Sequence, residues 1–101
     1  SHEDRETLVD EILYGDKNVL YGTQAIFSEG ISVDTLSCLI LATPVNNEPL
    51  LTQLCGRVIR KKEGKIDPVI IDIHLKGNTA RKQASNRVGF YMKQGWDMKY
   101  L

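Results

Sequence analysis

The side chains best suited to phosphate chemistry lie in a short segment, QLCGRVIR, at positions 53–60. On an α-helix, which turns by about 100° per residue, Gln53, Arg57 and Arg60 stack on one face at i, i+4 and i+7. Two guanidinium groups one turn apart, with an amide beside them, present forked donors that match phosphate oxygens. The spacing alone leaves a second interpretation open, in which this face is a solvated basic surface that continues into the following lysines.

A second candidate segment, GTQAIFSEGISV, spans residues 22–33 and follows a short β-type run. It therefore lies at the C-terminal edge of a predicted strand, where ligands bind in open α/β sheets. Thr23 contributes a hydroxyl and the following turn contributes backbone N–H groups, which together suit a phosphate. Gly30 permits backbone conformations that other residues resist. An ordinary strand-to-helix turn closed by glycine explains the same residues without a ligand.

The rest of the chain must supply elements that position these segments. Hydrophobic periodicity predicts helices over residues 3–14, from 49 to about 62, and over 79–94, with one further helical turn at 24–28. β-type runs predict strands at 18–21, 36–42 and 68–75. The alternation is typical of an α/β fold with a parallel sheet of about three strands flanked by helices. The last two strands look covered on both faces, which one layer of helices cannot achieve, so part of a larger domain is indicated.

The central helix has a second face, which is apolar. Leu51, Leu54, Cys55 and Val58 would pack on the sheet, opposite the basic face. Gly56 in the same helix leaves room for another backbone to approach, at a cost of about 1 kcal/mol in helix propensity.

Composition places the chain among globular proteins. It has 101 residues, of which 42% are hydrophobic and 26% are charged, so disorder is excluded. No apolar run approaches the roughly 20 residues that cross a membrane, and no signal peptide is expected at the polar start SHED. Two cysteines, Cys38 and Cys55, both in apolar contexts, predict reduced and buried thiols in a cytoplasmic protein.

The formal net charge of zero hides an asymmetry between the two halves. Residues 1–50 carry nine acidic and two basic residues, whereas residues 51–101 carry four acidic and eleven basic residues. Either the second half builds a basic face for an anionic partner, or the two halves attract one another in the fold. The basic residues that could steer DNA, or form a solvated face, are Lys61, Lys62, Lys65, Arg81, Lys82 and Arg87.

Smaller features near the C-terminus favour structural roles. Asp72, His74 and Lys76 alternate along one strand face, but a metal site needs more ligands than these, so no metal site is predicted. Trp96 and Tyr100 could stack on bases, but closing the core with an extended aromatic tail is the favoured interpretation.

The two candidate segments, taken together and in order, resemble a known pair of motifs. Thr23 with the phrase SEGISV, an apolar strand, and then Q-x-x-G-R-x-x-R resemble motifs V (22–33) and VI (53–60) of superfamily 2 helicases. SEGISV, the stretch GRVIRKKEGK and the closing helix are similar to phage recombination helicases of the UvsW type. The resemblance identifies residues 1–101 as the C-terminal part of the second RecA-like domain, hence a partial RecA-like sheet.

The resemblance implies roles for individual residues. Such helicases clamp ATP between two RecA-like domains and grip one nucleic-acid strand across both. Arg60 would be the arginine finger at the γ-phosphate, with Arg57 as its partner and Gln53 at the same cleft. Gly30 and Ser32 would line the nucleotide together with the arginines. Many members carry an acid at the position of Ser32, and a neutral hydroxyl holds the ribose less firmly.

The resemblance also implies partners and a missing half. Thr23 and Gln24 would contact nucleic acid, expected to be single-stranded or branched DNA in recombination or repair. No phosphate loop or Walker B pair is present, so the chain alone should not hydrolyse ATP. ATP with Mg²⁺ would be bound mainly by the N-terminal motor domain of the same parent chain. The expected location is a bacterial or phage-infected host cytoplasm, without membrane contact.

The RecA-like strand order predicts a gap, because a missing strand would lie between the strands at 37–42 and 69–74. The fragment must tolerate this gap, pair with another chain or rearrange, and an exposed apolar edge would favour self-association. Two other functions remain open. One is a non-catalytic nucleic-acid-binding α/β module, and the other is a helicase remnant that serves as a protein-interaction platform.

Overall fold

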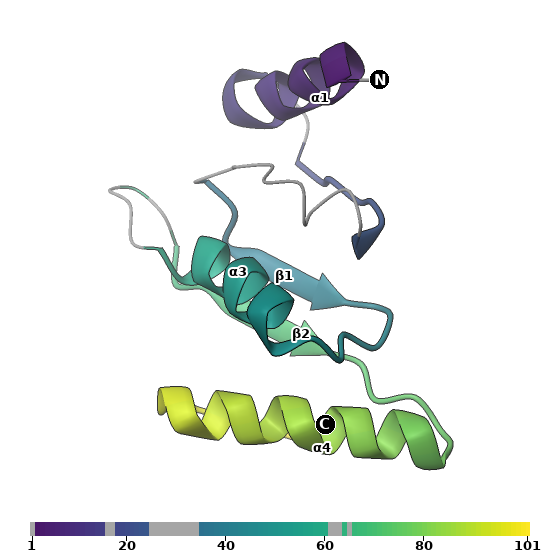
Figure 1. The fold of residues 1–101 in the computed structure, drawn as a ribbon. Helices are drawn as coiled ribbons and strands as arrows, with labels where there is room; N and C mark the ends of the chain where they lie inside the picture. The colour runs from purple at the N-terminus through teal and green to yellow at the C-terminus, as the bar shows by residue number, and fades with distance from the viewer. Residues whose placement is uncertain (1, 16–17, 25–34, 61–63, 65) are drawn as a thin grey trace.

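The computed structural model describes residues 2–15, 18–24, 35–60, 64 and 66–101. Its helices and strands are, in chain order, α1 (His2–Tyr14), β1 (Cys38–Leu41), α3 (Glu48–Ile59), β2 (Val69–Asp72) and α4 (Asn78–Gln94) (Figure 1). The three long helices are therefore confirmed, although the central one ends earlier than expected. The helical turn predicted at 24–28 lies outside the described residues, apart from Gln24.

The sheet has two strands among the described residues, where about three were expected. β1 and β2 pair in parallel, with Cys38 opposite Val69 and Leu41 opposite Asp72. Residues 18–21 form no strand, so that prediction is wrong. Val19 and Tyr21 are 79% and 91% exposed, so no apolar burial draws this segment into a sheet.

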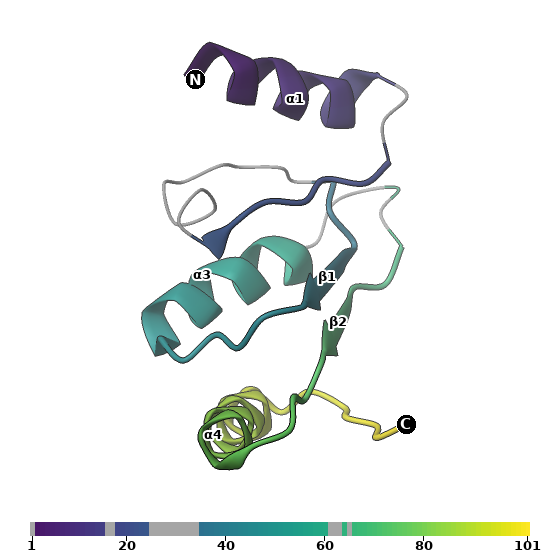
Figure 2. The same cartoon turned by 90° about the vertical axis from the view of Figure 1, so that its right-hand side faces the viewer.

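The two strands lie directly beside one another. Of the three predicted outcomes for the missing strand, direct pairing corresponds to rearrangement of the fragment, and no gap separates β1 from β2. A parallel pair needs a crossover of a dozen or more residues, and the connection that contains α3 is long enough to provide it. α3 lies across the sheet in both views, and α4 runs along the end opposite to α1 (Figures 1 and 2).

The core forms between α3, the inner face of the sheet and α4. α3 buries Leu51, Leu54, Cys55 and Val58, the four residues predicted for its apolar face. Leu51, Leu54 and Cys55 form one cluster with Leu41 of β1, Val45 of the following loop, and Phe90 and Tyr91 of α4; Leu39, Ile70 and Trp96 pack at the margin. The helix buries one side only, so its other side is available for chemistry.

The outer face of the sheet is uncovered by the described residues. Ile40 is 57% exposed, and Val69 and Ile71 are 52% and 44% exposed. Because side chains alternate across a strand, a single layer of helices covers only Leu39, Leu41 and their neighbours. The cover on a second face that the apolar strands predict is not supplied by the described residues. Self-association through this face stays a prediction.

Local signals set the ends of the helices. The Asn47 side chain accepts a hydrogen bond from the backbone N–H of Leu50 at 3.1 Å, and a proline follows in the first turn of α3. α3 ends at Ile59 rather than near residue 62, because Arg60 leaves the helical conformation at φ −54° and ψ 123°. α4 ends at Gly95, whose positive φ of 75° suits glycine.

Charge is segregated between α1 and α4. α1 (HEDRETLVDEILY) carries five acidic residues and one basic residue, whereas α4 (NTARKQASNRVGFYMKQ) carries four basic residues and no acid. The two helices lie on opposite sides of the molecule, and α1 packs against none of the other described elements (Figures 1 and 2). Attraction between these helices therefore does not explain the charge asymmetry. Of the helices described, none is long and apolar enough to span a membrane.

Candidate functional site

The predicted phosphate-binding face lies along α3 and at its end. Gln53 and Arg57 are half-buried outside the four-residue apolar face of α3, with Nε of Arg57 enclosed, and Arg60 is exposed. Gln53 and Arg57 share one helix face as predicted. Arg60 does not continue that stack as an i+7 residue, because it follows the last helical residue in an extended conformation. Its side chain therefore projects from an extended residue at the end of α3, not from the helix face that carries Gln53 and Arg57.

Gly56 faces open space on the exposed side of α3. A Cβ atom built there would meet nothing within 4 Å among the described residues. Room for an approaching backbone is thus present, but no described segment fills it.

We expect Gly56→Ala to raise the stability of this chain by about 0.5–1 kcal/mol, because glycine inside a helix costs that amount relative to alanine. Chemical denaturation monitored by far-ultraviolet circular dichroism measures the effect. Gly95→Ala is the matched comparison, since its φ of 75° makes a side chain strained, and it should destabilise. A destabilised Gly56→Ala variant would contradict the open environment of this residue.

Gln24 is held at the loop that follows β1. Its Nε2 donates to Thr43 Oγ1 at 3.0 Å and to the carbonyl oxygen of Pro44 at 3.2 Å. The amide predicted to contact nucleic acid therefore also ties its own segment to this loop, some 20 residues away in sequence. Thr23 is exposed beside it. Gly30 and Ser32, predicted to line the nucleotide, lie outside the described residues.

Of the candidate segment at 22–33, the structure describes residues 22–24, and the position of Gln24 can be compared with that of Arg60. Gln24 contacts the loop just before α3, whereas Arg60 comes just after it. A helix of 12 residues separates the two positions, which corresponds to about 18 Å. Among the described residues, Gln24 and Arg60 therefore lie at opposite ends of α3.

A buried ionic network links β2, α4 and the loop before α3. Arg87 donates from Nε and Nη2 to the two carboxylate oxygens of Asp72 at 2.8 and 2.9 Å, and Tyr91 donates its hydroxyl to Asp72 at 2.6 Å. Nη1 of Arg87 also reaches the carbonyl oxygen of Val45 at 3.4 Å. Arg87 is only 3% exposed, so the expectation that it could steer DNA from the surface is wrong.

The network sets the ionisation of its members. Burial opposes ionisation of Asp72, but hydrogen bonds from Arg87 and Tyr91 outweigh it and hold the pKa of this carboxyl below its usual 3.8. Burial, together with the hydrogen bond to Asp72, raises the pKa of Tyr91. Asp72 is therefore a negatively charged group whose role is structural. Throughout the described residues, no group of three or more acidic, cysteine or histidine side chains could hold a metal ion.

The two cysteines differ from one another, although both were predicted to be buried. Cys55 is fully buried, and this burial, with the nearby charge of Asp72, raises the pKa of its thiol to about 12. Cys38 is exposed on the outer face of the sheet, so its predicted burial is wrong.

We expect one fast-reacting thiol per chain in a native titration with a disulfide reagent at pH 8, and two after denaturation. Reactivity follows the thiolate fraction and exposure, both of which are low at Cys55. Cys38→Ser should abolish the fast reaction, whereas rapid modification of two thiols in the native protein would contradict the burial of Cys55.

The aromatic tail divides into two parts. Trp96 packs against the rings of Phe90 and Tyr91, with centroids 5.9 and 6.2 Å apart, which confirms its predicted role in closing the core. Tyr100 is 75% exposed and meets the imidazole of His74 edge-on, with ring centroids 5.6 Å apart. Of these two tail residues, Trp96 packs against the core and Tyr100 does not.

Comparison with known proteins finds several that are similar in sequence to this chain. It is 48% identical, over 93% of its length, to a protein of Escherichia phage T5 named "Probable helicase D10". Homologues of this chain are helicases. Other relatives are the Acanthamoeba polyphaga mimivirus protein named "Putative ATP-dependent RNA helicase L396", 30% identical over 82% of the chain, and the Saccharomyces cerevisiae protein named "Putative ATP-dependent helicase IRC3", 30% identical over 68%.

These helicase relatives are much longer than this chain. The chain spans 21% of the phage protein, 16% of the mimivirus protein and 10% of the yeast protein. No family model matches the sequence, and no solved structure matches it either. The relationship to helicases therefore rests on sequence identity along most of the chain.

Proposed function

We propose that this chain is the C-terminal part of the second RecA-like motor domain of an ATP-dependent superfamily 2 helicase. The observation that carries the proposal is the division of α3 into two sides. One side is fixed in the core by four buried apolar residues, and the other presents Gln53 and Arg57, with Arg60 at the helix end. The names of the helicase relatives support the helicase part of the proposal.

The hydrogen-bond donors on this side of α3 fit a nucleoside triphosphate. Gln53 contributes an amide donor, and Arg57 and Arg60 contribute permanent positive charge in a forked geometry. When bound with Mg²⁺, ATP supplies the γ-phosphoryl group that is transferred to water. Arg60 would place its guanidinium against charge that develops on the phosphoryl oxygens, while Arg57 and Gln53 hold and orient the same end of the ligand. Gly30 and Ser32 are proposed to line the nucleotide beside them.

The nucleic-acid contact is proposed at Thr23 and Gln24. They lie at the opposite end of α3 from Arg60, and this separation suits a motor in which ATP and the strand occupy different places. Single-stranded or branched DNA, in recombination or repair, is the proposed substrate. The N-terminal motor domain of the same parent chain is the proposed partner that completes the ATP site.

The test is nucleic-acid-stimulated ATP hydrolysis by the full-length parent protein. Hydrolysis that rises with single-stranded or branched DNA supports the motor. Hydrolysis that rises only with RNA would keep the motor and correct the substrate. No hydrolysis with any nucleic acid would favour the second candidate, a non-catalytic nucleic-acid-binding module, for which the basic, acid-free helix α4 is the supporting observation.

A further inference from the structure

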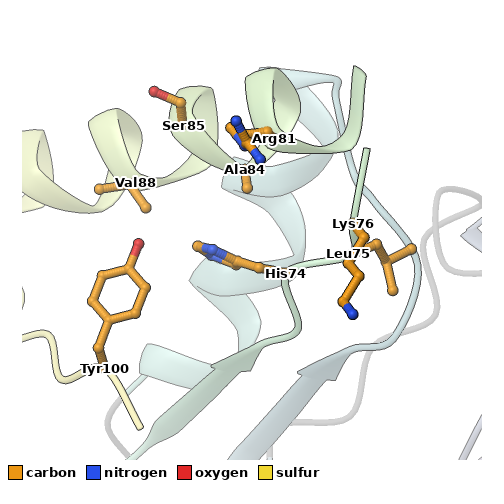
Figure 3. A pocket seen from close by; sticks show the side chains of 8 residues that line it. All are labelled: His74, Leu75, Lys76, Arg81, Ala84, Ser85, Val88 and Tyr100. Atoms are coloured by element: carbon orange, nitrogen blue, oxygen red, sulfur yellow. The ribbon is translucent and has the colours of Figure 1, made fainter. Parts of the chain in front are cut away.

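A pocket of about 570 Å³ lies between the end of β2, α4 and the C-terminal segment (Figure 3). Its volume falls within the range of about 300–1,000 Å³ that is usual for small-ligand sites. Lys76 and the imidazole of His74 line it from the segment after β2, Arg81 and Val88 from α4, and Tyr100 from the tail. None of these residues belongs to the candidate segments at 22–33 and 53–60.

The charge of the pocket favours an anion. Lys76 and Arg81 are both exposed, and no lining residue is acidic. Asp72 approaches the pocket through His74, with 3.7 Å between Asp72 Oδ1 and His74 Nε2. The charge of this carboxylate is already balanced by Arg87. Because α4 itself contains no acid, a phosphate group in the pocket would meet a net positive field.

The pocket also offers an aromatic surface. Tyr100 is 75% exposed and contacts His74 with the two rings perpendicular, so a face of the phenol ring stays open. Figure 3 shows these two rings side by side below α4, with Val88 projecting from the helix above them. Stacking on an exposed aromatic ring is a sequence-tolerant way to hold a base. Trp96 cannot serve in this way, because it is packed against the core.

We propose that this pocket binds one nucleotide of a single nucleic-acid strand, with the phosphate on Arg81 and the base on Tyr100, while Lys76 adds positive charge at the other end of the pocket. Cationic groups and an open ring within one pocket match the two parts of a nucleotide. The identity of the ligand rests on the proposed helicase function, but the pocket is a contact separate from Thr23 and Gln24.

The first test is binding of a fluorescein-labelled single-stranded oligothymidylate to the 101-residue chain, followed by fluorescence anisotropy. Arg81→Ala should weaken binding about tenfold and reduce the slope of log affinity against log salt by about 0.7, the value for one lost phosphate contact on a single strand. Lys82→Ala is the matched control, because Lys82 is an exposed neighbour of equal charge outside the pocket lining. Equal losses in the two variants would indicate a diffuse basic surface and overturn the proposal.

A second measurement does not depend on any variant. Titration with thymidine 5′-monophosphate should shift the ring resonances of His74 and Tyr100, whereas thymidine without phosphate should shift them far less at equal concentration. Ring resonances that stay unchanged would overturn the proposal. This failure is distinct from failure of the helicase function, because ATP hydrolysis by the parent protein does not report on Tyr100.

Discussion

Arg60→Ala is expected to lower nucleic-acid-stimulated ATP hydrolysis by the full-length parent protein about 10³-fold or more. An arginine that meets the charge developing on the transferred phosphoryl group is worth about 10³–10⁵ in turnover in other NTPases. Arg60 suits this use because it follows the last residue of α3 in an extended conformation and is exposed. The loss should fall on kcat, with the affinity for ATP largely kept, since the interaction strengthens only in the transition state.

Lys93→Ala is the matched control for Arg60→Ala, because Lys93 is an exposed cation in the last turn of α4, away from the α3 face. It should leave turnover within about twofold. Arg60→Lys separates charge from geometry, because an ammonium keeps the charge without the forked donors. Turnover of Arg60→Ala equal to that of the wild type would remove the arginine-finger role and leave this end of α3 as a binding or structural element.

Arg87→Met is expected to cost about 3–5 kcal/mol of stability, because it leaves the buried carboxylate of Asp72 without its ion-pair partner. Urea denaturation of the 101-residue chain measures the loss. Lys82→Met is the control, as an exposed cation on the same helix should change stability by less than about 0.5 kcal/mol.

A double-mutant cycle keeps this test decisive. Asp72→Asn combined with Arg87→Met should lose much less than the sum of the two single losses, because residues in one network couple. Additive losses would contradict the network. Acid provides an independent check, because the pKa of Asp72 is lowered on folding. Its contribution is complete above about pH 5 and disappears as the pH falls through the folded-state pKa, so Asp72→Asn should flatten the acid limb of the stability curve.

Most elements of this fold could be predicted from sequence because they satisfy their own local rules. α3 has its Asn47 cap, a proline in its first turn and an apolar face with helical spacing, and α4 has Gly95 at its end. The failed strand at 18–21 shows the limit of such rules. A β-type run becomes a strand only when a partner and a buried face exist, and neither is encoded in the run itself.

The candidate site was predicted as residue types but not as an arrangement. Side-chain spacing placed Gln53 and Arg57 on one helix face. The position of Arg60 could not be predicted in this way, because it depends on where α3 ends. The ionic network was missed, although Arg87 falls on the apolar stripe of α4 between Ala84 and Tyr91. A charge on an apolar stripe, and an acid inside an apolar strand at Asp72, were the signals that could have paired them.

The loop between β1 and α3 connects two distant segments of the chain through hydrogen bonds. Within four consecutive residues it accepts hydrogen bonds from Gln24 at Thr43 and Pro44, and from Arg87 at Val45, with Asn46 facing Asn86 at 3.5 Å. The next residue caps α3. If a bound nucleic-acid strand displaced the segment around Gln24, the force would therefore act on the start of α3, which bears the arginines, and on the basic helix α4 together. Displacement at one of these places must either move the others or break a hydrogen bond.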